Sequence, residues 1–276
     1  MSSCTAGGVA EAEPIAVVKI GGSILKNARA YRRAAIFIRN RHSAAPEERL
    51  IVVVSAQEGA TDAFERTARN IVGSPRRATL DLLWSTGELR SVALLTLHLE
   101  QLGVRATGLN IHEAGLMVPQ NVRTEDPGSI RLDRERLTGV LTEHSVAVVP
   151  GFFATDGLHS VVSLGRGGSD LTAVLLAVGL GASRCELVKD VPGYFTSDPN
   201  RNADALPVPF LTFEHALQLA DDGCDLVQRK ALEAALRYDL PLVVRSLDEK
   251  GNVSRVAGTI PGPTWVDSVS SLAVAP

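Results

Sequence analysis

The residues best suited to chemistry lie in one turn, Gly165-Arg166-Gly167-Gly168-Ser169-Asp170. Its glycines allow the backbone to approach a ligand closely, and Ser169 or Asp170 can cap the apolar helix predicted to run on to Leu180. A helix N-terminus attracts phosphate or carboxylate through its N–H groups. Because the turn also supplies a cation, Arg166, and an acid, Asp170, we interpret it as an anion-binding site.

A second charged candidate, Lys19, stands near the end of the predicted strand Ile15–Ile20 and is followed by Gly21-Gly22-Ser23. A buried ammonium without a partner is costly, so such a lysine is normally kept for an anionic ligand or a paired carboxylate. Two interpretations stay open: Lys19 binds an anion, or it forms a structural salt bridge with Asp170. Both can hold at once.

Other kinds of site are disfavoured. The sequence has no G-x-x-x-x-G-K-[ST] motif and no G-x-G-x-x-G after the first strand, which argues against a P-loop enzyme and the usual dinucleotide fold. Ser55 and Ser169 have no histidine motif beside them, which disfavours a nucleophilic hydrolase. The histidines are scattered without ligand spacing, and we assign no metal ligand.

Composition bounds the class of protein. The 276 residues are 45% hydrophobic, enough for a large core in one domain or two closely joined lobes. The net charge is −3 and there is no basic block, so no nucleic-acid partner is expected. Three widely spaced cysteines, Cys4, Cys185 and Cys224, indicate neither a disulfide framework nor a zinc site.

The N-terminal residues 1–14 carry no positive segment followed by an apolar core, and no apolar run reaches about 18 residues. We therefore expect a flexible tail over residues 1–14, a cytoplasmic location and no membrane contact. Residues 15–276 are expected to form a single domain. Its N-terminal lobe is predicted to cover about residues 15–160, and its C-terminal lobe about residues 161–276.

Strands and helices are predicted to alternate along the chain. The predicted strands are Ile15–Ile20, Leu50–Val54, Val104–Leu109, Ser145–Pro150, Cys185–Val188, Leu240–Val244 and Gly258–Ile260. The predicted helices are Ala28–Arg41, a long one within Leu80–Leu102, the run to Leu180, one capped by Thr212 and ending at Ala220, and Leu226–Tyr238. This order predicts an α/β fold, a three-layer αβα sandwich with a mainly parallel central sheet.

Four connecting segments are predicted to be irregular. Ser85–Glu88 is expected to interrupt the front of the long helix, and Gln57–Asp62 to form a polar loop. Residues 110–135 are expected to form a loop or hairpin that serves as a lid on the substrate side. Gly151–Gly157 is expected to lead through a turn into the glycine-rich segment.

Five motifs together resemble the amino acid kinase superfamily, and most closely the catalytic domain of aspartokinase. In chain order they are Val17-Val-Lys-Ile-Gly-Gly-Ser23, Val52-Val-Val-Ser-Ala-Gln-Glu-Gly-Ala-Thr61, Ser85-Thr-Gly-Glu88, Leu164-Gly-Arg-Gly-Gly-Ser-Asp170 and Asp190-Val-Pro-Gly-Tyr-Phe-Thr-Ser-Asp-Pro199. The last two are specific for the aspartokinase branch, whereas KIGGS alone would also suit isopentenyl phosphate or acetylglutamate kinases. The resemblance covers roughly residues 15–262.

This resemblance implies ATP-dependent phosphorylation of a carboxylate to an acyl phosphate, with Mg²⁺ and a small-molecule acceptor. Lys19 would then bridge the β- and γ-phosphates and stabilise the charge that develops between them, and Asp170 would orient it. We also expect a homo-oligomer. The implied phosphate-binding residues are Gly21, Gly22, Ser23, Gly167 and Gly168.

The acceptor and the nucleotide are assigned by the same resemblance. Glu88 suits an α-ammonium group, and Arg166 suits a carboxylate through a bidentate fork. The implied acceptor-binding residues are Ser55, Thr61, Glu88, Arg166 and Ser169. The implied nucleotide-binding residues are Lys189, Asp190, Gly193, Tyr194, Asp198 and Lys230.

Three departures from the family pattern bear on function. Family members usually carry a phosphate-binding lysine where this chain has Asp225, so Lys189, Arg229 or Lys230 substitutes, or nucleotide binding is weak, or the active site is retuned. The family's Gly-Gly-Thr-Ser is Gly-Gly-Ser-Ile here, and the lid around Glu125–Arg131 matches poorly, which puts the acceptor in question. The sequence leaves no room for paired ACT regulatory domains before Pro276, so feedback inhibition through such a domain is not expected.

Two alternatives to an aspartate kinase follow from these departures. One is a kinase of the same superfamily with another small acceptor, a phosphate monoester or a different acid. The other is a catalytically weakened binding or regulatory homologue, indicated only by Asp225. Retention of Lys19, Arg166 and Asp170 favours an active kinase.

Overall fold

A central sheet of eight strands organises the molecule. In chain order these strands are β1 (Ile15–Ile20), β2 (Arg49–Val54), β3 (Ala106–Gly108), β6 (Val146–Pro150), β9 (Cys185–Val188), β12 (Phe210–Thr212), β13 (Leu242–Arg245) and β14 (Val253–Ala257). Their order across the sheet is β12-β14-β13-β9-β1-β2-β6-β3, and every pair of neighbours is parallel except β13 and β14. The predicted, mainly parallel sheet is confirmed.

The computed structural model describes residues 14–119, 129–158, 160–165, 167–199, 202–248 and 251–259. Several predictions fall outside these ranges: the N-terminal tail apart from Pro14, the middle of the predicted lid, Arg166, and Ile260 at the end of the predicted last strand.

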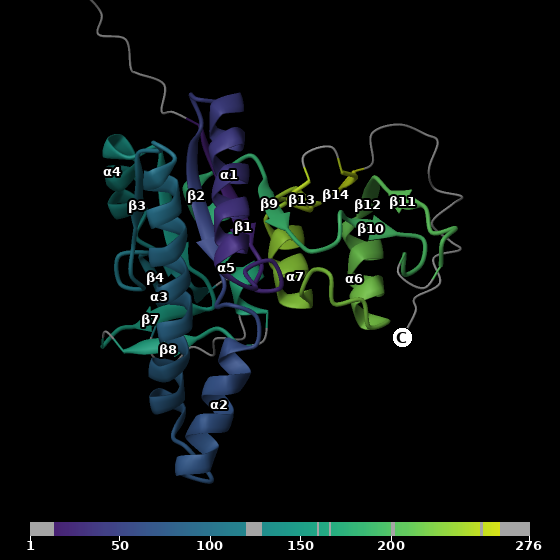
Figure 1. Ribbon diagram of the computed structural model, residues 1–276. Helices are drawn as coiled ribbons and strands as arrows, with labels where there is room; N and C mark the ends of the chain where they lie inside the picture. Colours follow the sequence, from purple (N-terminus) through teal and green to yellow (C-terminus); the bar gives the residue numbers. More distant parts are fainter. Residues whose placement is uncertain are drawn as a thin grey trace, which may run out of the picture.

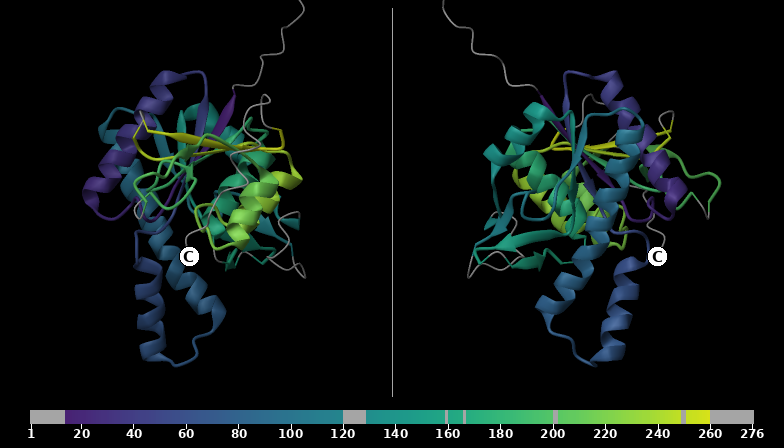
Figure 2. Two further views of the ribbon diagram at one scale, coloured as in Figure 1. Left: turned by 90° about the vertical axis from the view of Figure 1, so that its right-hand side faces the viewer. Right: turned by 60° about the vertical axis from the view of Figure 1, so that its left-hand side comes forward.

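Helices pack on both faces of the sheet (Figure 1). On one face lie α1 (Ala28–Ala44) and α3 (Arg77–Gln101), and on the other lie α4 (Arg134–Glu143), α5 (Gly168–Leu180), α6 (Phe213–Asp221) and α7 (Arg229–Arg237). The three-layer αβα sandwich is therefore confirmed. Below it, α2 (Ala60–Ile71) and the first turns of α3 project as a helical hairpin (Figure 2).

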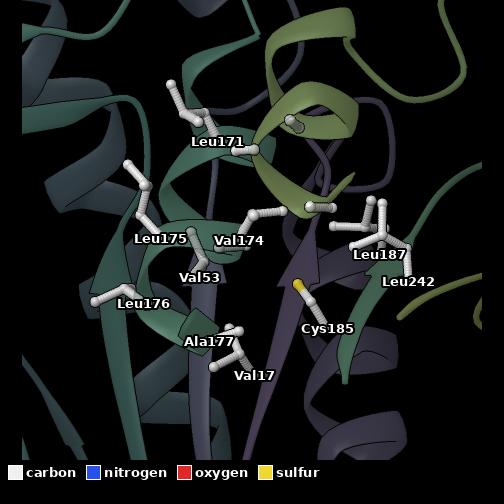
Figure 3. Close-up of a cluster of buried hydrophobic side chains, with 14 of the residues drawn as sticks. Val17, Val53, Leu171, Val174, Leu175, Leu176, Ala177, Cys185, Leu187 and Leu242 are labelled. Carbon is white, nitrogen blue, oxygen red and sulfur yellow. The ribbon is translucent and has the colours of Figure 1, made fainter. Parts of the chain in front are cut away.

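The central strands are mostly apolar because both of their faces are buried. On β1, Val17 packs into the core shared with α5, whereas Val18 packs into the core shared with α1 and α3. Figure 3 shows the first of these cores, where Leu171 and Val174 of α5 lie over β1, β2 and β9. This packing fixes α5, and hence its N-terminal turn, against the ends of the central strands.

Two smaller sheets complete the described structure. One consists of β4 (Leu116–Val118), β5 (Arg131–Leu132), β7 (Phe153–Asp156) and β8 (Val161–Ser163), in the order β5-β4-β7-β8. The other pairs β10 (Tyr194–Phe195) with β11 (Pro207–Val208). The antiparallel pairing of β4 with β5 agrees with the hairpin predicted within residues 110–135. The prediction of a turn over Gly151–Gly157 is wrong, because Phe153–Asp156 of this segment forms the strand β7, which pairs with β8.

The predicted interruption of the long helix is wrong. The hydroxyls of Ser85 and Thr86 donate to the carbonyls of Leu82 and Leu83, so these residues bond back to the helix and do not break it. The helix α3 also begins earlier than predicted, at Arg77.

Other boundaries also differ from prediction. The segment Gln57–Asp62, predicted to be a polar loop, is a loop only as far as Gly59, because the helix α2 starts at Ala60. No residue of α2 is buried, so its first residues have the polar composition of a loop. The helix α7 begins at Arg229 and not at Leu226. The last strand of the described structure is β14 (Val253–Ala257), which ends before the predicted strand Gly258–Ile260. The sequence did not indicate β14 because one of its buried residues, Ser254, is polar and interrupts the alternation of apolar and polar residues.

The predicted cap of α5 is also corrected. Gly167 is its N-cap residue, with φ of 73°, and no side chain caps the helix. Glycine is suited to this left-handed conformation, and a Cβ at Gly167 would overlap the side chain of Gln228. Thr212, by contrast, caps α6 as predicted, since its hydroxyl accepts from the N–H of His215.

Candidate active site

A cavity of about 570 Å³ lies where the central strands end. Lys19 is next to last in β1, and Ser55 directly follows β2; Lys189 directly follows β9, and Phe152 follows β6 by two residues. Because these four neighbouring strands are parallel, their carboxyl ends meet at one edge of the sheet. The N-terminal turn of α5 closes the cavity with Gly167, Gly168, Ser169 and Asp170.

One carboxylate joins two lysines at the bottom of this cavity. Lys19 Nζ lies 2.7 Å from Asp170 Oδ1, and Lys189 Nζ lies 2.7 Å from Asp170 Oδ2. The side chains of Lys19 and Asp170 are buried, and that of Lys189 is 11% exposed. The salt bridge expected between Lys19 and Asp170 is present, and the second ammonium leaves the trio with a net charge of +1.

Burial and charge act in opposite directions on this trio. Burial raises the pKa of Asp170, but the ammonium groups of Lys19 and Lys189 outweigh burial and hold this pKa below its ordinary value. Burial lowers the pKa of Lys19 below its ordinary value, and Asp170 only partly offsets this effect. An additional anion beside the two lysines would be electrostatically favoured.

The turn after β1 approaches the turn after β2 closely. A Cβ at Gly22 would lie 2.7 Å from the carbonyl oxygen of Ala56, so only glycine fits there. The N–H of Gly21, predicted to bind phosphate, donates to the carbonyl of Val188 at 3.3 Å. Its amide is therefore engaged within the protein, and Gly22 and Ser23 remain the candidate donors of this turn.

In the turn before α5, too, one predicted phosphate donor is already engaged within the protein. Gly168 N–H donates to the carbonyl of Gly165 at 3.0 Å, which engages the second predicted phosphate donor. Gly167 lines the cavity together with Ser169. Arg166, which the sequence assigned to the acceptor, lies outside the described residues.

Glu88 of α3 reaches the same cavity from the other side. Its Oε1 accepts from the N–H of Ala56 at 3.3 Å, and within the described ranges its buried Oε2 has no hydrogen-bond partner. Burial raises the pKa of Glu88 to about 8. An ammonium group of a ligand would satisfy Oε2 and favour the ionised form. Ser55, Thr61 and Ser169, which the sequence assigned to the acceptor, line the same cavity.

The sequence did not identify one wall of the cavity, formed by Arg77, Trp84 and Phe152. The Arg77 guanidinium lies 4.9 Å from the centre of the Trp84 ring, whose centroid is 6.2 Å from that of Phe152. Phe152 has φ of 72°, and its backbone is held there by bonds with Thr172 and Leu164. Arg77 and Trp84 are seven residues apart, two turns of one helix, a spacing that an uninterrupted helix from Arg77 would have revealed.

The predicted nucleotide-binding residues are more dispersed. Lys189 lines the first cavity and also a second one of about 590 Å³, which it shares with Ser23 and Asp190. Lys230 lies beside Gly165. Four predicted residues line neither cavity: Lys230, Gly193, Tyr194 and Asp198.

Tyr194 in particular is 4% exposed and belongs to the core around α5, where burial raises the pKa of its hydroxyl. Its N–H donates to the hydroxyl of Ser254, against which Gly193 also packs. This pair therefore holds the segment after β9 onto β14.

Asp225, the acid at the position of the expected lysine, is exposed and lines neither cavity. Arg229 forms ion pairs with Asp221 and Glu233, which engage its charge outside the cavities. Of the three cations considered as substitutes for the family lysine, Lys189 is the one that reaches Asp170.

The described part of the chain contains no group of three or more His, Cys, Asp or Glu residues placed to hold a metal ion. Among the same residues, no helix has both the length and the apolar character required to span a bilayer.

Several known proteins are similar to this chain in sequence and in fold. The model of the amino acid kinase family matches residues 14–246. The aspartokinase of Geobacillus stearothermophilus is 36% identical over 200 residues, which cover 71% of this chain and 48% of that protein. The chain thus spans about half the length of this curated relative.

Two solved structures are similar over most of the chain. Aspartate kinase from Synechocystis has a TM-score of 0.76 at 35% identity, covering 89% of this chain and 40% of that one. E. coli aspartokinase III in complex with aspartate and ADP has a TM-score of 0.72 at 25% identity, covering 91% of this chain and 66% of that one.

Proposed function

The chain belongs to the amino acid kinase family, and from this premise we propose that it uses ATP to phosphorylate a carboxylate of aspartate, forming an acyl phosphate. The observation that carries the proposal is the buried trio in which Lys19 and Lys189 share Asp170, because it presents excess positive charge at the end of the central strands. The aspartate and ADP bound to the similar E. coli enzyme support the choice of both substrates.

In the proposed reaction, a carboxylate oxygen of aspartate attacks the γ-phosphorus of ATP while the bond from that phosphorus to the bridging oxygen breaks, and ADP leaves. Negative charge grows on the bridging and γ-phosphate oxygens, where Lys19 and Lys189 stabilise it. Asp170 holds both ammonium groups in place through its two carboxylate oxygens. No general base is needed, because the attacking carboxylate is already ionised near pH 7.

We propose that Glu88 recognises the α-ammonium group of aspartate. Its unpartnered Oε2 and raised pKa indicate that the free enzyme holds a proton there, which is released when the ammonium binds. Ser55, Thr61 and Ser169 supply hydroxyls around the acceptor, and Arg166 is proposed to bind a carboxylate. Arg77 is a further cation on the same cavity.

The nucleotide is proposed to lie along the Lys189–Pro199 segment, with its phosphates toward Lys19 and Lys189 and toward the amides of Gly22 and Ser23. The described residues offer no group of three ligands for a metal ion, which fits a Mg²⁺ ion held mainly by phosphate oxygens and water. Such an ion would neutralise part of the phosphate charge.

An acceptor screen tests this function. ADP release should be measured with aspartate, glutamate, acetylglutamate, UMP and isopentenyl phosphate, with hydroxylamine added to trap any acyl phosphate. We expect aspartate to give ADP and hydroxamate in equal amounts. ADP release with UMP or isopentenyl phosphate, without hydroxamate, would instead identify another acceptor, and no turnover with any of the five would favour the non-catalytic alternative.

A further inference from the structure

A third cavity, of about 700 Å³, lies on the face of the sheet opposite α6 and α7. Side chains alternate along β14: Val256 packs into the core with α7, whereas Arg255 lines the cavity. Figure 2 shows α6 and α7 on one side of the yellow strand β14. We call this space the arginine cavity and define it by Arg41, Arg184, Glu186, Phe210, Arg245 and Arg255.

The charges around the arginine cavity do not balance. Its four guanidinium groups are accompanied by two carboxylates, Glu186 and the adjoining Glu48. Arg41 and Arg184 both pair with Glu186, at 3.1 and 2.9 Å, and both also contact Glu48. The four guanidinium charges therefore exceed the two carboxylate charges by two in the described structure.

Arg245 and Arg255 are the less closely paired arginines of this cavity. Arg245 forms a long ion pair with Glu186 Oε2, at 3.8 Å, and its guanidinium lies 5.1 Å from the centre of the Phe37 ring. Arg255 is exposed on the middle of β14. The donors of Arg255 are therefore available to an anion, and Arg245 adds a second, loosely paired positive charge to the same cavity.

Apolar side chains adjoin these donors in a regular row. Across the neighbouring strands, Val243 pairs in register with Glu186 on one side and with Arg255 on the other, and Arg255 pairs with Phe210. The cavity thus offers an acid, an aliphatic side chain, a cation and an aromatic ring in sequence. A ligand that fits must combine an anionic group with an apolar part.

We propose that the arginine cavity binds a small molecule in which a carboxylate or a phosphate is joined to an apolar group. The anion would lie between Arg245 and Arg255, whose planar forks suit either group, and the apolar part would pack on Phe210 and Val243. The cavity volume is within the range of small-molecule sites, which favours such a ligand over a protein partner. The proposal does not depend on the kinase activity.

Calorimetric titration with two probes, phenyl phosphate and benzoate, tests this site. The informative variant is Arg255→Gln, because Arg255 is exposed and its loss should not unfold the protein; Arg66→Gln, which removes an exposed cation of α2, is the matched control. Lys189→Ala serves as a second comparison, since it alters the active-site cavity and leaves the arginine cavity intact.

We expect at least one probe to bind the wild-type chain, with an affinity that Arg255→Gln lowers about tenfold or more. Arg66→Gln and Lys189→Ala should leave that affinity within about twofold. The probe that binds more tightly identifies the anion, phosphate or carboxylate. The proposal is overturned if neither probe binds, if Arg255→Gln has no effect, or if Lys189→Ala alone abolishes binding, which would place the probe in the active site.

Discussion

Two ion clusters adjoin β9, and they are built from different cations. At the carboxyl end, Lys19 and Lys189 share one acid, Asp170. On the sheet face, the arginines Arg41 and Arg184 share two acids, Glu48 and Glu186.

The difference between the clusters follows from the chemistry of the cations. An ammonium group is a compact charge on a flexible stem, so a lysine can hold a carboxylate and still act on a phosphate group that changes during reaction. A guanidinium group makes several hydrogen bonds in one plane and fixes the elements it joins. We infer that the lysine cluster serves the reaction and that the arginine–glutamate cluster ties α1 to β9 and the segment before β2.

The largest expected effect is on the stability of the arginine cluster. Glu186→Gln removes a buried carboxylate and leaves Arg41 and Arg184 poorly compensated, so the free energy of unfolding should fall by about 3–5 kcal/mol. Urea unfolding measures it, with the exposed Glu47→Gln as control. A loss below about 1 kcal/mol would show that this cluster does not tie the elements together.

A substitution in the lysine cluster should lower the reaction rate and leave the stability of the fold nearly unchanged. Lys19→Ala removes a charge that acts mainly as phosphoryl transfer proceeds, so kcat should fall by about 10²–10³. The fold should persist, because Asp170 keeps its pair with Lys189. Steady-state kinetics and a thermal melt check both parts, with the exposed Arg32→Ala as control; unfolding with unchanged turnover per folded molecule would make Lys19 a structural residue.

The proton on Glu88 predicts how acceptor binding depends on pH. Because its pKa is raised to about 8, the free enzyme is protonated below that pH, and binding an ammonium must release the proton. The acceptor KM should therefore fall by up to about tenfold per pH unit from pH 6 to 7 and level off above pH 8. Initial rates at several pH values measure this, and Glu88→Gln should remove the dependence; a flat profile in the wild type would exclude this role for Glu88.

Lys189 is expected to have a smaller effect, on ATP. Lys189→Ala should raise the ATP KM about tenfold, the typical cost of one hydrogen bond to a charged group. Asp225→Lys should change it by less than about twofold, because Asp225 is exposed and lines neither active-site cavity. Titration of Mg-ATP into both variants measures the affinity for ATP in each. A large change in Asp225→Lys with little change in Lys189→Ala would place Asp225, and not Lys189, at the phosphates.

Residues fixed by strand ends could be predicted from the sequence, and residues fixed by long-range packing could not. Lys19 and Asp170 stand beside glycine turns after or before clear apolar runs, so their meeting followed from the parallel sheet. Tyr194 belongs to an equally clear motif, yet it packs into the core because Ser254 holds its backbone, a contact between residues 60 positions apart. Arg77 and Trp84 were missed because the helix that aligns them was predicted to begin later.

A single-turnover experiment tests the central claim that the lysine cluster transfers the γ-phosphoryl group of ATP to a carboxylate. Excess chain is mixed with Mg-ATP, aspartate and hydroxylamine, and ADP and aspartyl hydroxamate are counted for the wild type and for Lys19→Ala. Our account predicts one hydroxamate for each ADP in the wild type and a rate lower by about 10²–10³ in the variant. ADP without hydroxamate, or equal rates in the two proteins, would contradict it.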